Sequence, residues 1–243
     1  MKKGLLMKLL IRITILFLLS LAAVGCSKSF KMEKESVGAP MLEDFESLGT
    51  SEDDDDSDEL KGAGFGYTPE GQGGESVKQR AQSGDTEAQL IFANQLLQGR
   101  GGQSKDLKES FKWFHRAAKK GNVEAQYKLG MMYFNAKGTV RDYHLSFVWY
   151  RRAAQKGYAK AQNALGYLYE TGLGTQKNSS QAALWYEKAA NQGHAPSQYN
   201  LGLHYHEGKG GTKEKAKAKK WLNRASQGGS GEARKLKKRL YDY

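Results

Sequence analysis

Residues 157–192 have the sequence GYAKAQNALGYLYETGLGTQKNSSQAALWYEKAANQ, and this stretch decides the fold. Its tryptophan is one of four in the 243-residue chain, and each follows the previous one by 36 residues: Trp113, Trp149, Trp185 and Trp221. A fixed period of this size is typical of helical repeat arrays. Such an array offers a surface for binding, so a catalytic role needs evidence of its own.

The spacings within each repeat predict two helices. In the first helix a small residue, a Leu-Gly pair and a tyrosine share one face, as in Ala125, Leu129-Gly130 and Tyr133. In the second helix the shared face is Ser110, Trp113, Phe114, Ala117 and Ala118. Glycine-containing turns join the two helices, and a residue suited to a helix start follows each turn: Asp106, Asp142, Asn178 and Glu214.

This pattern resembles the Sel1-like repeat, a relative of the tetratricopeptide repeat, over residues 74–243. The resemblance implies an all-α fold, a right-handed α-solenoid of stacked antiparallel helix pairs whose main role is protein–protein binding. The expected units are about 84–120, 121–156, 157–192 and 193–228, with a closing helix at 230–241 and the whole solenoid at 76–243. A closing helix with few apolar residues and a basic outer surface suits the end of such an array.

Residues 1–25 are expected to be a lipoprotein signal peptide. A basic start precedes an apolar run that is too short to span a bilayer and that stops at Ala23-Val24-Gly25-Cys26. Small residues before a cysteine resemble a bacterial lipobox, although Ala23 stands where leucine is usual. The resemblance implies lipidation of Cys26, the only cysteine, and a place in the bacterial envelope, on the outer membrane facing the periplasm. The alternatives are an ordinary secretory signal and an uncleaved anchor.

Residues 26–75 are expected to form a disordered tether between this anchor and the repeats. They contain 4 basic and 14 acidic residues, including the acidic run 52–59, and a glycine-rich stretch follows. Residues 76–243 contain 30 basic and 12 acidic residues, a net charge of +18. A basic surface favours anionic partners. Because the protein is expected to be exported, nucleic acid is not among the expected partners.

The sequence shows no catalytic constellation, cofactor motif or metal site. His204 and His206 point in different directions on a helix, and the glycine-rich segment 208–213 lacks the preceding strand of a phosphate-binding loop. Some secreted Sel1-like proteins are cysteine-rich and have been described as β-lactamases or penicillin binders, but the repeats of this chain have no cysteine. An enzyme acting on cell-wall material or β-lactams therefore remains an alternative to a binding scaffold.

The concave face of the solenoid is the expected binding surface for a protein or peptide, and the resemblance implies that the first helix of each pair lines it. Candidate groove residues are Asn94, Tyr127, Met131, Asn163, Tyr167, Glu170, Tyr199 and His206. Leu90, Leu97 and Phe134 occupy the same rows and suit either the groove or the core between repeats. The basic residues at the end of the array are a solvated cap or a second candidate site, for anionic lipid or glycan: Lys217, Lys220, Arg224, Arg234, Lys237, Lys238 and Arg239.

Overall fold

The computed structural model describes residues 75–241, which contain ten helices and no strand. A short helix α4 (Val77–Ser83) precedes four helix pairs, and α13 (Gly231–Tyr241) follows them. The pairs are α5 (Thr86–Gln98) with α6 (Leu107–Lys119), α7 (Val123–Asn135) with α8 (Tyr143–Gln155), α9 (Ala159–Thr171) with α10 (Ser179–Asn191), and α11 (Ala195–Glu207) with α12 (Lys215–Gln227). Cys26, the predicted signal peptide and the predicted tether lie outside the described residues.

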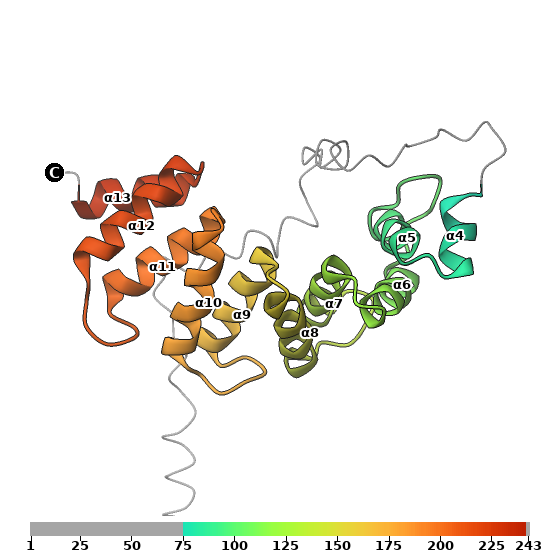
Figure 1. Ribbon diagram of the computed structural model, residues 1–243, viewed down its shortest axis with the longest axis horizontal. Helices are drawn as coiled ribbons and strands as arrows, with labels where there is room; N and C mark the ends of the chain where they lie inside the picture. The colour runs from blue at the N-terminus through green and yellow to red at the C-terminus, as the bar shows by residue number, and fades with distance from the viewer. Residues whose placement is uncertain (1–74, 242–243) are drawn as a thin grey trace, which may run out of the picture. The chain divides into compact units, whose positions relative to one another are not determined.

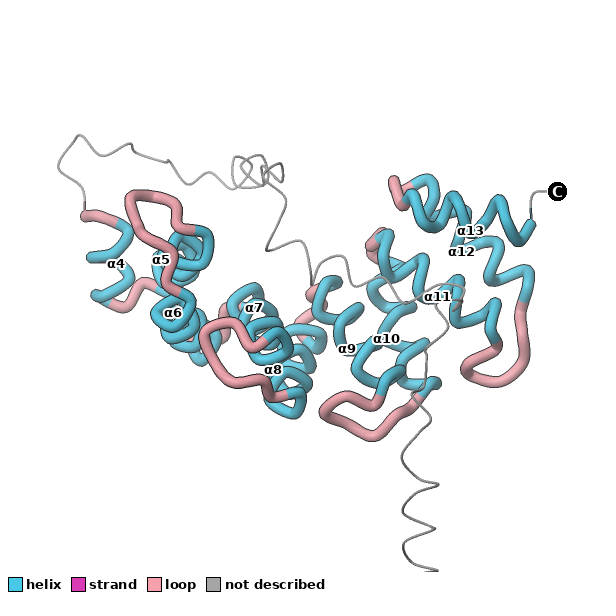
Figure 2. Tube along the Cα trace, turned by 180° about the vertical axis from the view of Figure 1, so that it is seen from behind, coloured by secondary structure: helices cyan, strands magenta, loops and turns pink. Residues whose placement is uncertain are grey.

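Successive helices pack against one another along the chain, so the pairs stack in tandem as an α-solenoid. Figure 1 shows this order from α4 to α13, and Figure 2 shows that longer loops join the two helices of a pair while short turns join one pair to the next. The all-α solenoid predicted from the sequence is confirmed.

Polar side chains fix where the second helices begin. Asp106, Asp142 and Asn178 accept hydrogen bonds from the backbone N–H groups three residues later, over 2.8–2.9 Å. These bonds satisfy backbone donors that the first turn of a helix leaves free. Glu214 makes no such side-chain bond at the start of α12, so the fourth second helix lacks the cap that the first three have.

Close contact within the second and third pairs depends on the glycine of the Leu-Gly motif. A Cβ atom on Gly166 would lie 2.7 Å from the ring of Tyr186, and one on Gly130 would lie 2.8 Å from the ring of Tyr150. No side chain fits there, so the first helix presents bare backbone to the aromatic ring of the second. The two helices consequently approach closely and bury the ring completely.

The glutamine that follows the small residue of each repeat joins neighbouring pairs. Its side-chain amide donates to a backbone carbonyl at the end of the preceding second helix, over 3.1–3.2 Å, in every repeat. The donors are Gln89, Gln126, Gln162 and Gln198, and the acceptors are Ala81, Ala118, Ala154 and Ala190. These bonds use carbonyls that a helix end leaves without an intrahelical partner.

The four tryptophans pack in the second helices, as their spacing predicts. Trp113, Trp149 and Trp221 are buried, and Trp185 is half-buried. Each indole lies under a basic group three residues further along its helix, Arg116, Arg152, Lys188 and Arg224, at 4.0–4.9 Å from the ring centroid. The cations thus cover apolar rings at the surface and stay hydrated themselves.

Candidate functional site

The predicted groove residues fall into two groups by burial. Tyr127, Met131, Asn163, Glu170 and Tyr199 are buried, whereas Asn94, Tyr167 and His206 are half-buried. Burial places the first five in the packing between successive helices, where a partner has no access to them in this structure. Of the eight candidates, the accessible ones are therefore Asn94, Tyr167 and His206.

Two of the aromatic candidates, the buried Tyr127 and the half-buried Tyr167, pack against other rings of the array. The ring of Tyr127 packs 5.6 Å from that of Tyr150 and 5.3 Å from that of Tyr158, centroid to centroid. Tyr167 packs edge-on against Phe134 at 6.2 Å. These rings fill the space between one repeat and the next, which is the work that large aromatic side chains do in a core.

The junction between the third and fourth repeats differs from the earlier ones because polar side chains are buried in it. Asn163 Oδ1 accepts hydrogen bonds from Ser197 Oγ at 2.9 Å and from Asn200 Nδ2 at 3.0 Å. Leu90 and Tyr127 occupy the position of Asn163 in the first two repeats. A polar cluster has thus replaced apolar packing at this one junction.

A buried carboxylate extends this polar character. Glu170 stands where the first two repeats have Leu97 and Phe134, and only 9% of its surface is exposed. Tyr186 Oη donates to Glu170 Oε2 over 2.9 Å, and Lys209 Nζ donates to Oε1 over 2.8 Å. Lys209 also pairs with Glu207 at 2.7 Å. The carboxylate is therefore neutralised and hydrogen-bonded, as a buried charge requires.

The surroundings shift the pKa values of both partners of Glu170. Burial raises the pKa of Tyr186 well above its usual range, and the neighbouring Glu170 carboxylate raises it further. Burial by itself would lower the pKa of Lys209, but its hydrogen bonds to Glu170 and Glu207 outweigh this effect, and the pKa is raised. At neutral pH the tyrosine is a donor and the lysine is charged, as the hydrogen bonds need.

His204 is a third polar replacement, and unlike Glu170 it is left unsatisfied. Met132 and Leu168 occupy its position in the second and third repeats. Only 2% of His204 is exposed, and neither ring nitrogen has a hydrogen-bond partner within residues 75–241. Burial lowers its pKa, Glu170 and Glu207 oppose this, and Lys209 adds to it. The imidazole is therefore neutral at pH 7, with one donor and one acceptor unused.

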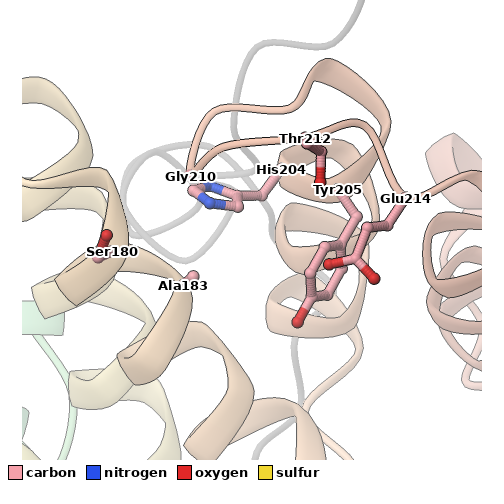
Figure 3. Close-up of a pocket in the computed structure, with 7 residues that line it drawn as sticks. All are labelled: Ser180, Ala183, His204, Tyr205, Gly210, Thr212 and Glu214. Atoms are coloured by element: carbon pink, nitrogen blue, oxygen red, sulfur yellow. The ribbon is translucent and has the colours of Figure 1, made fainter.

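His204 lies at the wall of a pocket of about 270 Å³. Figure 3 shows Ser180 and Ala183 of α10 on one side of it, and His204 and Tyr205 of α11 on the other. The loop before α12 closes it with Gly210 and Thr212, and Glu214 completes the lining. The pocket therefore lies between the third and fourth repeats, beside the polar junction.

A missing aromatic ring explains the pocket. In the first two repeats Phe111 and Phe147 pack edge-on against Tyr133 and Tyr169 of the following repeat, each at 5.3 Å between centroids. The corresponding residues here are Ala183 and Tyr205. A methyl group replaces the phenyl ring, so α10 leaves space beside Tyr205 that the earlier repeats fill.

The covering loop differs from those of the second and third repeats and resembles that of the first, where a Cβ atom on Gly101 would meet the side chain of Gln95 at 2.5 Å. Gly138 and Gly174 press so closely on the preceding second helix that a Cβ atom would lie 2.0 Å from a backbone oxygen, of Leu107 and Tyr143 respectively. A Cβ atom on Gly210 would instead meet His204 Nε2, at 2.9 Å. The fourth loop thus rests on the histidine ring and leaves the start of α10 uncovered.

The predicted anionic docking residues lie on α12 and α13. Lys217, Lys220, Arg224, Arg234, Lys238 and Arg239 are exposed, and Lys237 is half-buried. Lys217 pairs with Glu214 at 2.8 Å, and Arg224 covers Trp221. The structure thus gathers these cations at one end of the array, where they are open to solvent.

Two kinds of feature are absent from the part of the chain that the structure describes. Residues 75–241 contain no cluster of three or more His, Cys, Asp or Glu side chains arranged to hold a metal ion. Among the same residues, no helix combines the length and the hydropathy that crossing a bilayer requires.

Sequence reasoning did not identify the pocket, although the signal was available. His206 cannot join His204 at a metal, and residues 208–213 match the inter-helix turns of the other repeats, so neither feature by itself predicts a pocket. Comparison of equivalent positions points to the site, because Ala183 stands where the first two repeats have phenylalanine, and Glu170 stands where they have Leu97 and Phe134. His204 likewise replaces Met132 and Leu168 of the second and third repeats. The contact of Gly210 with His204 matches that of Gly101 with Gln95, the equivalent pair of the first repeat.

Comparisons with known proteins agree with this architecture. The model of the Sel1 repeat matches residues 88–122, 123–158, 159–194 and 195–230, more than half of the chain. No curated protein matches the sequence.

Two solved structures show the resemblance in three dimensions. The first is a protective antigen of uropathogenic Escherichia coli strains that displays an SLR fold, with 37% identity over 63% of this chain and a TM-score of 0.61. The second is a Sel1 repeat protein from Oxalobacter formigenes, with 31% identity over 65% of this chain and a TM-score of 0.62. The chain covers 33% of the first protein and 64% of the second, less than two thirds of either. Four tandem matches on four stacked helix pairs place this chain in the Sel1 repeat family.

Proposed function

We propose that this protein is an envelope-anchored scaffold that binds a protein or peptide partner through its Sel1 repeats. Sel1 repeat proteins generally bind protein partners. The observation that carries the proposal for this chain is the pocket between the third and fourth repeats, where Ala183 leaves space and His204 leaves polar atoms unused. A buried polar group without a partner costs stability, and a ligand that hydrogen-bonds to it would remove that cost.

Site-specific photocrosslinking in the native envelope tests this function. A benzophenone amino acid at Thr212, on the exposed loop beside the pocket, should give a discrete adduct with a partner. The matched control is Val140, which occupies the same position of the second repeat and is 80% exposed. Adducts that are the same from both positions, or adducts from neither, would contradict a specific binding site at this junction.

We infer that the anchor is a lipid on Cys26, and that the protein faces the periplasm from the outer membrane. The support is the order of the N-terminal sequence: basic residues, an apolar run, then Ala23-Val24-Gly25-Cys26. Substitution of Cys26 by alanine should move the protein from the membrane fraction to the soluble fraction. Retention of the variant in the membrane would contradict lipid anchoring, and separation of inner and outer membranes tests the location.

The exposed cations of α12 and α13 support a second, weaker contact. An array tethered near a membrane experiences the negative potential of anionic head groups, and basic residues at its surface are attracted to it. We propose that this basic end touches the anionic lipid surface, with an anionic glycan as the alternative partner. This contact is independent of the pocket, so each can be removed without the other.

A further inference from the structure

The size of the pocket limits what it can hold. Pockets for drug-sized molecules and cofactors measure roughly 300–1,000 Å³. An apolar cavity of about 150 Å³ is enough to bind benzene. The pocket at the third junction, at about 270 Å³, lies between these sizes. It suits one aromatic side chain and is small for a cofactor.

The contacts between the first and second repeats, and between the second and third, show which group fits beside the tyrosine that lines the pocket. Phe111 meets Tyr133 at an interplanar angle of 88°, and Phe147 meets Tyr169 at 87°. Tyr205 is the equivalent tyrosine at the third junction, with Ala183 in place of the phenylalanine. A ring from outside the chain can therefore take the edge-on position that the chain itself fills twice. Such aromatic pairs add about 0.5–1.5 kcal/mol to the burial of the ring.

The histidine makes the third position different from the first two. Where Met132 and Leu168 supply apolar surface, His204 supplies an imidazole whose two nitrogens have no partner within residues 75–241. A hydroxyl group on the incoming ring can donate to the unprotonated nitrogen or accept from the protonated one. A phenylalanine or leucine side chain would leave both nitrogens unused.

The remaining lining residues agree with a neutral peptide. Ser180 and Thr212 offer hydroxyl groups at the rim, and Glu214 offers a carboxylate that accepts hydrogen bonds and is paired with Lys217 at 2.8 Å. Gly210 covers the histidine ring with backbone alone, and both ring nitrogens are buried beneath it. An incoming hydroxyl therefore reaches His204 by a shift of this loop, which displaces no side chain. Peptide N–H groups suit this rim.

We propose that this pocket holds a tyrosine side chain of the partner, with its ring edge-on to Tyr205 beside Ala183 and its hydroxyl group hydrogen-bonded to His204. The proposal rests on the binding function above and names the chemistry that the partner presents. It separates a tyrosine peptide from leucine-rich or acidic peptides, which lack the ring or the neutral hydroxyl.

Titration with capped amino acids tests the proposal on the full chain. The probes are N-acetyl-tyrosinamide, N-acetyl-phenylalaninamide and N-acetyl-leucinamide. The readout is the NMR signal of the histidine rings, of which the chain has five, together with the methyl group of Ala183. The tyrosine probe should shift the signals of His204 and Ala183 saturably. The phenylalanine probe should bind about 3- to 10-fold more weakly, because one hydrogen bond contributes about 0.5–1.5 kcal/mol. The leucine probe should leave both signals unchanged.

Three variants assign the result to the pocket. Ala183→Phe fills the space with the ring of the earlier repeats and should abolish the shifts, and Ala183→Met does the same with a more adaptable side chain. The matched control is Leu184→Phe, which adds the same ring at a neighbouring position of α10 that is 43% exposed, and it should bind the tyrosine probe normally. His204→Leu should make the tyrosine and phenylalanine probes bind equally. Circular dichroism checks that each variant remains helical.

Several outcomes would overturn the proposal. These are equal binding of all three probes, shifts confined to histidines other than His204, and shifts that persist in both Ala183 variants. The proposed scaffold function fails separately. If the tyrosine probe binds at His204 but Thr212 gives no specific adduct in the envelope, the pocket chemistry stands and the scaffold function does not. If Thr212 gives an adduct that Ala183→Phe leaves unchanged, the scaffold function stands and the tyrosine proposal is wrong.

Discussion

Ala136 is the one described residue other than glycine with a left-handed backbone, at φ 57°. It ends α7, and the equivalent helix ends have Gly99, Gly172 and Gly208. An L-residue in this conformation costs about 1–2 kcal/mol, because its Cβ crowds the following carbonyl oxygen. The second repeat therefore carries a local strain that the other three avoid.

Substitution of Ala136 by glycine should therefore stabilise the protein. The expected gain is about 0.5–1 kcal/mol, since relief of the strain exceeds the extra freedom that glycine gives the unfolded chain. Urea denaturation followed by circular dichroism measures it as a higher midpoint. The control is Ala164→Gly, in the middle of α9, which should lower the midpoint. A lower midpoint for both variants would contradict the assignment of strain.

His204 makes stability depend on pH in a defined direction. Burial lowers its pKa in the folded protein below the usual 6.5, against the opposing carboxylates of Glu170 and Glu207 and with the added effect of Lys209. Below pH 6.5 the unfolded chain therefore takes up a proton that the folded chain resists. Stability should fall as the pH drops from 6.5 through the lowered pKa, and His204 should contribute no pH dependence above that window.

The measurement is the urea midpoint of the protein and of His204→Leu, at about pH 8 and about pH 5. The protein should lose more stability than the variant on acidification. Other titrating groups, such as His115, affect both chains equally and cancel in the comparison. An acid-induced gain that disappears in His204→Leu would show that Glu170 and Glu207 dominate the histidine instead.

At this scale the sequence predicts which residues belong to the repeat better than which residues are accessible. Tyr127, Asn163 and Tyr199 have side chains that interfaces favour, but the packing between successive repeats uses the same types. Their burial depends on how closely the next pair of helices approaches, which no single repeat determines. Their role as partner contacts stays a prediction. Asn94, Tyr167 and His206 are more accessible to a partner.

At the scale of the elements, the hydrogen bonds of Glu170 hold α9, α10 and the fourth loop together. Glu170 comes from α9, Tyr186 from α10 and Lys209 from the loop before α12. In the first pair the two helices carry Leu97 and Phe114 at the same positions. The chain thus contains an apolar version and a charged version of one contact.

Exchanging one version for the other should be possible only if both residues change. Tyr186→Phe leaves an oxygen of Glu170 without its donor, and Glu170→Leu leaves a buried hydroxyl group without its acceptor, so each should cost about 1–3 kcal/mol. The double variant recreates the Leu97–Phe114 pair and should recover most of that loss. A double-mutant cycle by urea denaturation measures the coupling, expected at about 0.5–3 kcal/mol. Additive losses would show that the hydrogen bond does not couple α9 to α10.

Helices were more predictable than the loops that join them. The helix pairs are predicted by the 36-residue spacing of the tryptophans together with the Leu-Gly pairs and the polar caps. These signals are local, because each motif lies within a few turns of a single helix. The loop at 208–214 carries the same glycine pattern as its counterparts, yet Gly210 rests on His204. Its seat depends on a side chain from another element, so the sequence of the loop does not reveal it.

At the scale of the whole molecule, the repeats pack regularly, but the charge is distributed unevenly along the chain. The segment 26–75 has a net charge of −10 and the segment 76–243 a net charge of +18. Attraction between exposed charges and a lipid surface is screened over about 10 Å at 0.1 M salt. Any contact through the basic end should therefore weaken as salt is added.

Vesicle flotation tests that contact in the Cys26→Ala chain, which lacks the proposed lipid. The protein should bind phosphatidylglycerol vesicles and not phosphatidylcholine vesicles, and binding should fall with salt. Neutralising Lys220, Arg234 and Lys238 together should reduce binding by about 3 kcal/mol at low salt, about 1 kcal/mol for each residue. The matched control neutralises Lys105, Lys108 and Lys119, three exposed lysines of the first repeat. An equal loss in both triple variants would show that net charge alone is responsible.

The tryptophan ladder also makes this protein its own spectroscopic reporter. Each repeat contains one indole, and each indole lies under a cation of its own helix. A chain that keeps a single tryptophan, with phenylalanine at the other three positions, emits from one known repeat. Four such chains would follow the loss of structure repeat by repeat in a fluorimeter, with no dye attached. Trp185, which is half-buried in the repeat beside the pocket, would report the arrival of a partner there.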